Sequence, residues 1–300
     1  MSEPGREPLA AALEVLRLEQ VDADTFVGGS LPLPGGRVFG GQVLAQALLA
    51  AGRTVQPDRL PHSVHGYFLR AGDVERPIRF AVERLRDGRS FTARRTHALQ
   101  DGIPILSMIT SFQTEQPGHD HADPAPADVP APEELPSALD ELDGIGHPLA
   151  DFWFRSGAFE LRHVERSLFA PQGAVGDAGA AEHGSAPDAG RQRVWIRARG
   201  AVPDDPLLHR ALIALACDQV MLEPVLRRHG LGWSSPGLSI ASLDHAMWWH
   251  RPARVDEWLL YVQASPSAQG GRGLGTAQVF TRDGTLVATI AQEGMVRLPT

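Results

Sequence analysis

Two segments of the chain are apolar at almost every position, and this pattern predicts two buried helices. The first runs over residues 43–51, Val-Leu-Ala-Gln-Ala-Leu-Leu-Ala-Ala; the second, over 204–230, contains Ala-Leu-Ile-Ala-Leu-Ala-Cys-Asp-Gln-Val-Met-Leu. A helix that is apolar on every side is surrounded by protein. Asp204 or Asp205 can cap the second helix, and Pro206 suits its first turn. We therefore expect two helices at the centre of the molecule.

Elsewhere apolar and polar residues alternate, which is typical of strands with one buried face. The strands expected in this way cover residues 62–69, 78–86, 90–99, 105–112, 159–165, 194–199, 257–264, 275–281 and 285–292. Asp-Gly pairs at 87–88, 101–102 and 283–284 are typical of hairpin turns between antiparallel strands. A short helix over 8–17 and a strand-like stretch over 18–28 precede them. The pattern predicts an α+β fold.

Two segments interrupt this alternation and divide the chain. Residues 114–150 are rich in Pro, Ala, Asp and Glu, and residues 172–192 are rich in Gly and Ala, as in linkers and surface excursions. The first holds a cluster that resembles metal ligands but that we interpret as solvated: His119, Asp120, His121 and Asp123. We expect an N-terminal unit over 1–115, a linker over 116–158, and a C-terminal unit over 159–300 with a flexible insertion at 172–192.

The stretch 239–252 combines polar groups with large apolar side chains. Met247, Trp248 and Trp249 follow one another without alternation, so we expect both faces of this strand to be covered. Its polar members are Ser242, Asp244, His245, His250 and Arg251. Polar groups in such surroundings need hydrogen-bond partners or a chemical task. Satisfied core groups and a functional site both fit the pattern.

The two halves repeat each other, and the repeat points to one set of residues. Ser63 and Ser242 each come before the first strand of a half, and Gln113 and Gln292 each come near the end of its last strand. Only the second predicted helix has an acid inside its apolar run, Asp218. A carboxylate there is costly unless it is hydrogen-bonded, so it either caps a neighbouring element or holds water for catalysis. Chemistry that needs all three groups is expected in the second half.

Composition excludes several classes of protein. The 300 residues are 43% hydrophobic and 21% charged, with a net charge of −8, which is typical of a globular chain and not of one that binds nucleic acid. One cysteine, Cys217, excludes an internal disulfide and a cysteine-based zinc cluster. The N-terminus lacks the pattern of a signal peptide, and no apolar run is long enough for a membrane helix. We expect a soluble cytoplasmic protein.

Several motifs, in one order along nearly the whole chain, resemble those of acyl-CoA thioesterases of the bacterial thioesterase II type. They are Val38-Phe39-Gly40-Gly41-Gln42, residues 62–70, residues 85–91, residues 241–248, residues 256–261, residues 265–268 and Gln292-Glu293-Gly294. The resemblance implies a double hotdog fold, in which each of two antiparallel sheets wraps around a central helix. It also implies that Asp218, Ser242 and Gln292 are catalytic. Ser242 stands where other members carry Thr, and the insertion at 172–192 looks longer than usual.

Hydrolysis of a thioester needs an activated water and stabilisation of an oxyanion. Asp218 can accept a proton from water, while the side chains of Ser242 and Gln292 both donate and accept hydrogen bonds. We expect direct attack by water, with no cofactor or metal and no acylated serine, because the Gly-x-Ser-x-Gly motif is absent. We expect an acyl-CoA substrate and a homo-oligomer. Candidate substrate-binding residues are Gly40, Gly41, Gln42, His65, Arg70, Met247 and Arg251.

Glycines at a helix start let a ligand approach the backbone, and the N–H groups there can hold an oxyanion. Arg70 and Arg251 are candidates for the CoA phosphates, because the chain contains no Lys. Two other functions remain open. A dehydratase or hydratase acting on acyl thioesters would use His65 or His245 with an acid. A non-catalytic acyl-CoA-binding module would bind without turnover.

Overall fold

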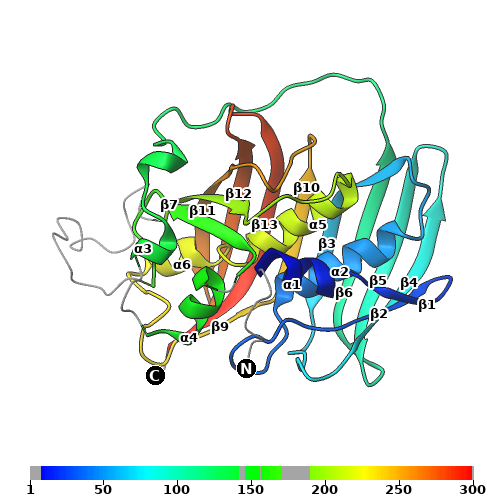
Figure 1. Ribbon diagram of the computed structural model, residues 1–300, viewed down its shortest axis with the longest axis horizontal. Coiled ribbons are helices and arrows are strands. Elements are labelled where there is room, and N and C mark those ends of the chain that lie inside the picture. Colours follow the sequence, from blue (N-terminus) through cyan, green and yellow to red (C-terminus); the bar gives the residue numbers. More distant parts are fainter. Residues whose placement is uncertain (1–7, 142–145, 156, 170–189, 299–300) are drawn as a thin grey trace.

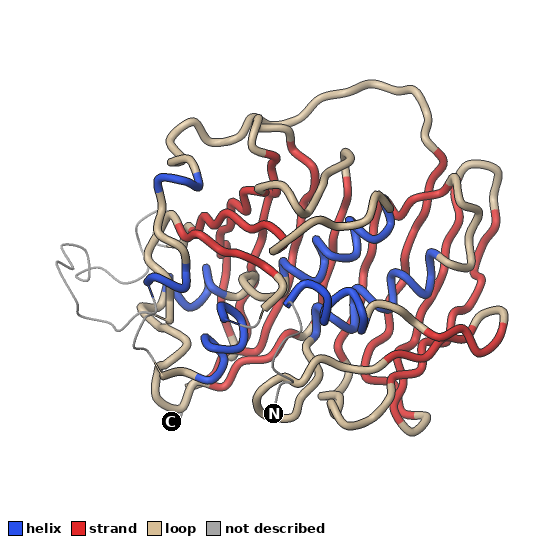
Figure 2. Tube along the Cα trace, in the orientation of Figure 1, coloured by secondary structure: helices blue, strands red, loops and turns tan. Residues whose placement is uncertain are grey.

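A computed structural model describes residues 8–141, 146–155, 157–169 and 190–298. One long antiparallel sheet curves around helices that lie on its inner face (Figure 1). Figure 2 shows the helices at the centre of the molecule with strands on both sides of them. The strands run in the order β1-β2-β4-β5-β6-β3-β10-β13-β12-β11-β8-β7, and β9 pairs with β13.

The first half supplies the strands from β1 to β3 in this order. Its elements are α1 (Pro8–Val15), β1 (Glu19–Asp22), β2 (Thr25–Gly28), α2 (Gly40–Gly52), β3 (Arg59–Phe68), β4 (Ile78–Asp87), β5 (Phe91–Gln100) and β6 (Ile103–Thr114). The expected turn between β5 and β6 is present, since Asp101 and Gly102 have φ values of 50° and 77°. Positive φ at both central residues matches the twist of the flanking strands.

The second half supplies the remaining strands. Its elements are β7 (Phe159–His163), β8 (Gln192–Ala198), α5 (Pro206–Cys217), α6 (Glu223–Arg228), β9 (Ser239–Ser242), β10 (Asp244–Trp249), β11 (Leu259–Gln269), β12 (Arg272–Thr281) and β13 (Leu286–Arg297). Burial in β10 alternates strictly, with His245, Met247 and Trp249 on the inner face. The side chains between these three are half-buried, so the expectation that both faces of this strand are covered is met only in part.

The double hotdog architecture is confirmed, and its two sheets join edge to edge. Strands β3 and β10 pair antiparallel, with His65 opposite Ala246 and Val64 opposite Met247. This pairing continues the hydrogen-bonded ladder from one half into the other. A long antiparallel sheet with one covered face alternates between buried and exposed residues, as seen along β5.

Helices α2 and α5 pack against each other at the centre of the molecule (Figure 1). Small residues allow their close approach: a Cβ built on Gly52 would lie 2.4 Å from Cδ2 of Leu207. Both helices are buried along nearly their whole length, as their apolar sequences predict. The Asp205 side chain caps α5 by accepting hydrogen bonds from the Leu207 and Leu208 amides at 2.9 and 3.3 Å.

The single helix expected over 204–230 is wrong in one respect. Helix α5 ends at Cys217, Asp218 is its C-cap with φ −64° and ψ −16°, and α6 begins at Glu223. Pro224 gives a physical reason. Proline lacks an amide hydrogen, and its ring clashes with the carbonyl four residues earlier, so an uninterrupted helix through this point is unfavourable. The break places Asp218 at a helix end rather than inside a helix.

The excursion after β6 crosses the outside of the molecule and then forms short helical turns near the second half (Figure 1). These turns are η1 (Pro132–Glu134), α3 (Ala138–Glu141), α4 (Pro148–Ala150) and a π-helical turn, η2 (Asp151–Arg155). The Trp195 indole donates a hydrogen bond to the Pro130 carbonyl at 3.0 Å, which anchors the excursion. The predicted insertion at 172–192 lies mostly outside the described residues. Within the described part of the chain, no helix is long and apolar enough to cross a bilayer.

Candidate active site

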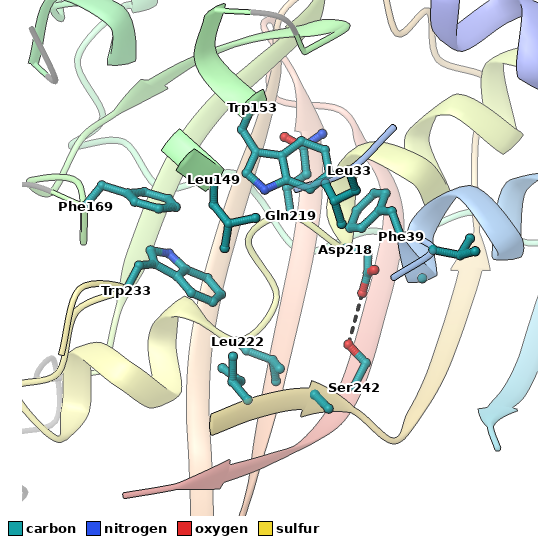
Figure 3. A pocket seen from close by; sticks show the side chains of 14 residues that line it. Leu33, Phe39, Leu149, Trp153, Phe169, Asp218, Gln219, Leu222, Trp233 and Ser242 are labelled. Atoms are coloured by element: carbon teal, nitrogen blue, oxygen red, sulfur yellow. Dashed lines mark hydrogen bonds between the residues drawn. The ribbon is translucent and has the colours of Figure 1, made fainter. Parts of the chain in front are cut away.

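A pocket opens where the start of α2, the end of α5 and strand β9 meet the excursion (Figure 3). It is lined by Leu33, Val38, Phe39, Gly40, Leu149, Trp153, Phe169, Asp218, Gln219, Leu222, Trp233, Ile240, Ala241 and Ser242. Most of these side chains are apolar, and in Figure 3 the Asp218 carboxylate and the Ser242 hydroxyl point toward each other on one side. An apolar hollow with a few converging polar groups is the usual form of a small-molecule site.

Asp218 is held by groups from three separate elements. Its Oδ2 accepts a hydrogen bond from the Gly41 amide at 2.7 Å, while its Oδ1 accepts from Gln292 Nε2 at 2.7 Å and from Ser242 Oγ at 3.3 Å. Gly41 lies in the first turn of α2, where the free amides and the helix dipole favour a negative charge. The end of α5 therefore delivers a carboxylate to the positive end of α2.

Ser242 and Gln292 reach the carboxylate from neighbouring strands. Ser242 is the last residue of β9 and pairs with Gly294 of β13. Gln292 lies on the inner face of β13, fully buried, and its Nε2 donates a hydrogen bond to Ser242 Oγ at 2.7 Å. Since Gln292 fills one acceptor position of the serine oxygen, the serine can still donate its own hydrogen. A water beside this group would meet both a carboxylate and a hydroxyl.

The structure thus brings together the three residues proposed as catalytic. Neither His65 nor His245, one of which a dehydratase would use, points into this pocket. His65 is exposed on the outer face of the sheet, and its ring meets Trp248 edge-on at 5.0 Å. His245 is buried, and its Nδ1 lies 2.7 Å from Gln292 Oε1 rather than beside Ser242. Neither histidine belongs to the described pocket lining.

Two members of the predicted glycine-glycine-glutamine group have structural partners. The Gly41 amide is bound to Asp218, so it is not free for an oxyanion. The Gln42 side chain is buried; it accepts from the Leu31 amide at 2.8 Å and donates to the Gly29 carbonyl at 3.0 Å. Gln42 thus ties α2 to the preceding loop, and its part in substrate binding stays a prediction. Gly40 does line the pocket.

The remaining predicted substrate-binding residues also lie outside the described lining of this pocket. Met247 is fully buried and belongs to the core. The Arg70 guanidinium donates to the Pro104 carbonyl at 3.1 Å, and Arg251 pairs with Asp120 of the excursion. A sequence motif marks neighbours along a strand, whereas alternate strand residues point to opposite faces, so residues of one motif need not line the same pocket.

Sequence reasoning missed the aromatic wall of the pocket. Trp153 packs edge-on against Phe39 with ring centroids 4.5 Å apart, and Phe169 stacks on Trp233 at 5.6 Å. Phe169 and Trp233 lie outside named helices and strands, and Trp153 lies in a short turn, so no periodicity marks them. The run Phe-Trp-Phe at 152–154, inside a segment otherwise rich in Pro and acids, is the signal that was available.

The matching family models are those for acyl-CoA thioesterase, over residues 180–295, and for the acyl-CoA thioesterase N-terminal domain, over residues 30–113. The chain is 35% identical to "Acyl-CoA thioesterase 2" of Haemophilus influenzae, over 95% of this chain and 96% of that one. It is 36% identical to human "Acyl-coenzyme A thioesterase 8", over 98% and 91%. The solved acyl-CoA thioesterase II TesB2 of Mycobacterium marinum superimposes with a TM-score of 0.75 and 41% identity, over 97% and 98% of the two chains.

Proposed function

The chain belongs to the acyl-CoA thioesterase family and is a thioester hydrolase, and we propose that Asp218, Ser242 and Gln292 hold the water that cleaves its acyl-CoA substrate. The observation that supports this proposal is the shared carboxylate oxygen. Asp218 Oδ1 accepts from both Ser242 and Gln292 at the wall of an apolar pocket. A water bound there meets a base and a hydrogen-bond donor at once.

In the proposed reaction, the oxygen of this water attacks the thioester carbonyl carbon while Asp218 takes one of its protons. The carbonyl electrons move to the oxygen and form a tetrahedral oxyanion. When they return, the carbon–sulfur bond breaks, and the proton on Asp218 passes to the leaving thiolate. The products are a free acid and CoA, and Asp218 is again a carboxylate. No acyl-enzyme forms, so Ser242 only orients the water.

The start of α2 is the proposed site of the oxyanion. Gly40 lines the pocket at the N-terminal end of a 13-residue helix, where the helix dipole is positive. A Cβ on Gly40 would lie 2.9 Å from Asp218 Oδ2 and 3.0 Å from the Phe68 ring, so the start of α2 can lie this close to the proposed base only because this residue is glycine. The apolar wall formed by Leu149, Trp153 and Leu222 would take the acyl chain.

Replacement of the proposed base tests the mechanism. Asp218→Asn keeps the shape of the side chain, and we expect kcat on a medium-chain acyl-CoA to fall by about two to four orders of magnitude. The variant should still fold and bind acyl-CoA, because Asn keeps the volume of the side chain. It should melt somewhat lower than the wild type, because Asn has one acceptor oxygen where Asp218 uses two. Release of CoA is followed with a thiol reagent, and melting by circular dichroism.

Ser242→Thr is the matched control, because it keeps the hydroxyl, and it should retain most of the activity. Ser242→Ala and Gln292→Ala should each lose less than Asp218→Asn, and their effects should not multiply in the double variant. Full activity of the Asp218→Asn protein would contradict the mechanism.

Binding of acyl-CoA by the wild type without any turnover would instead indicate a binding module. Activity that EDTA abolished and a divalent ion restored would contradict the metal-free reaction. Cytoplasmic location and homo-oligomerisation stay predictions.

A further inference from the structure

His245 is a fully enclosed titratable residue next to the site, and the proposed reaction gives it no task. It projects from β10 toward the helices and is 1% exposed. Its Nδ1 lies 2.7 Å from Gln292 Oε1, and its Nε2 lies 3.8 Å from the Cys217 sulfur. Cys217 directly precedes Asp218 at the end of α5. His245 therefore closes a ring of contacts that runs from Asp218 through Gln292 and back to the same helix end.

The carboxamide of Gln292 can point in two ways, and the contacts distinguish between them. Its Nε2 faces Asp218 Oδ1 and Ser242 Oγ, each at 2.7 Å. Turned by half a rotation, the amide would place Oε1 against the carboxylate, where two acceptors repel each other. The orientation with Nε2 toward Asp218 leaves Oε1 toward His245, and that oxygen needs a donor.

His245 can supply this donor only with a hydrogen on Nδ1. Burial lowers the pKa of His245, against the opposing effects of the Gln292 hydrogen bond and the nearby Asp218 and Asp244 carboxylates. The ring is therefore neutral near pH 7 and carries a single hydrogen. Burial also raises the pKa of the Cys217 thiol well above its usual value, so the thiol keeps its hydrogen, which it donates to the Ala214 carbonyl at 3.1 Å. The Gln292 oxygen, 2.7 Å from Nδ1, thus favours the hydrogen on that nitrogen and leaves Nε2 bare.

We infer that His245 is a positioning residue for thioester hydrolysis. As the neutral Nδ1–H tautomer, it fixes the Gln292 carboxamide so that both amide hydrogens point at Asp218 and Ser242. The inference rests on the proposed function, because it assigns to His245 the task of orienting one member of the proposed catalytic group. Without the imidazole hydrogen bond, the amide would be held only from the side of Asp218 and Ser242, and the water-binding groups would lose part of their fixed geometry.

The first test needs no substrate. Nitrogen-15 correlation spectra of the wild-type protein should show His245 with a hydrogen on Nδ1 and none on Nε2 near pH 7. The His245→Asn variant identifies the His245 signals by their loss. The Nε2–H tautomer, or a charged ring at that pH, would overturn the inference, since neither arrangement follows from the contacts described.

The second test separates positioning from stability. His245→Leu removes the donor, and we expect kcat to fall about 10- to 100-fold while KM changes little, since the lost bond acts through Gln292 and not on the substrate. His245→Asn places an amide N–H at the position of Nδ1, and should restore kcat to within about three-fold of wild type. His209→Leu is the matched control. His209 is also a buried imidazole, but its Nδ1 accepts from the Val255 amide, away from the site. This control should lower the melting temperature and leave kcat unchanged.

The outcomes separate the two proposals. If the wild type hydrolyses acyl-CoA and His245→Leu is equally fast, or if Asn fails to rescue a folded protein, the positioning role is wrong and the proposed function stands. If the wild type hydrolyses no acyl-CoA, the proposed function fails, and the positioning role fails with it. If His245→Leu does not fold, the tautomer and the Asn variant decide the matter.

Discussion

At the scale of single residues, the position of Asp218 depends on the absence of a side chain at Gly41. A Cβ built on Gly41 would lie 2.7 Å from the Leu215 carbonyl oxygen and 2.9 Å from the Asp218 Cβ. Both neighbours belong to the end of α5, so the backbone of one helix would have to move. The glycine thus lets its own amide reach Asp218 Oδ2 at 2.7 Å.

We therefore expect Gly41→Ala to displace Asp218. The variant should lose about 1–3 kcal/mol of unfolding free energy, the usual cost of overpacking, and kcat should fall at least about ten-fold. Denaturant unfolding and acyl-CoA hydrolysis measure the two effects. Gly29→Ala is the control, because a Cβ there meets nothing within 4 Å. Wild-type kcat in Gly41→Ala would show that this amide does not position the carboxylate.

Single residues also mark the limit of prediction from sequence at the site. Asp218, Ser242 and Gln292 could be proposed from the sequence because the internal repeat isolates them and the family resemblance implies a role for each. The surroundings of Asp218 could not be read in the same way. An apolar run with one acid inside predicts a continuous helix. In the structure α5 ends at Cys217, one residue before this acid, and the chain turns before α6 begins at Glu223. Tertiary contacts to Gly41 and Gln292 satisfy the acid, and no local pattern records them.

At the scale of elements, the two central helices end differently. The C-cap of α5 is Asp218, whereas the C-cap of α2 is Arg53, whose guanidinium donates to the Leu18 carbonyl at 2.7 Å. The helix starts differ as well. The second residue of α2 is Gly41, while the second residue of α5 is Leu207, whose side chain fills the space beside Gly52. The end of α2 thus lacks the acid found at the end of α5, and the start of α5 lacks the open glycine backbone found at the start of α2.

This difference predicts that only the helix end carrying Asp218 takes part in the chemistry. Ser63→Ala and Gln113→Ala should leave kcat within about five-fold of wild type, because α2 ends in Arg53 where α5 ends in the proposed base Asp218. The matched changes at Ser242 and Gln292 should cost far more in the same assay. Equal losses in the two pairs would mean that both halves contribute to turnover.

The excursion is the element that completes the pocket. Trp153 of η2 closes against Phe39 beside α2, with ring centroids 4.5 Å apart. Trp153→Ala should open this wall without touching Asp218, Ser242 or Gln292. We expect the ratio of kcat/KM between long and short acyl chains to rise at least about ten-fold, as the fit of a few methylenes can decide such ratios.

The control for this change is Trp258→Ala. Trp258 is buried in a separate cluster with Trp195, outside the described lining of the pocket. Its loss should lower the melting temperature and leave the chain-length preference unchanged. If Trp153→Ala behaves in the same way, the excursion shapes stability and not selectivity.

Elements with strong local signals were predictable, and the remainder was not. Alternation and Asp-Gly turns gave the hairpins, since a strand pattern and its turn are short-range features. The wall formed by Trp153, Phe169 and Trp233 depends on where an irregular segment docks, which side-chain periodicity does not encode. For this reason the sequence pointed to the strand residue Met247 as a lining residue, although it faces the core.

At the scale of the whole molecule, the two halves share one sheet and one core. The β3–β10 ladder crosses between the two units expected over 1–115 and 159–300, and α2 and α5 belong to a single apolar cluster. A continuous core of this kind couples the buried titratable groups to global unfolding. Burial lowers the pKa of His245 below its usual value of 6.5.

Stability should therefore fall in mildly acidic solution. Between 6.5 and the lower folded-state pKa of His245, the unfolded chain binds a proton that the native chain does not. The stabilisation is thus complete above pH 6.5 and is lost as the pH falls through this window, by at most about 1.4 kcal/mol per pH unit. Denaturant unfolding across this range should show a shallower slope for His245→Asn than for the wild type. An equal slope in the two proteins would mean that His245 does not contribute.

The unequal helix ends also have an evolutionary consequence. In a pair of identical chains, every substitution appears at both symmetric corners, so neither can change alone. Here the corresponding helix ends, Arg53 and Asp218, are encoded separately within one polypeptide. Mutation can alter one while selection preserves the other. The helix end at Arg53 can thus change while the site at Asp218 is retained. Directed evolution could use it as a second position at which to install a new activity in the same fold.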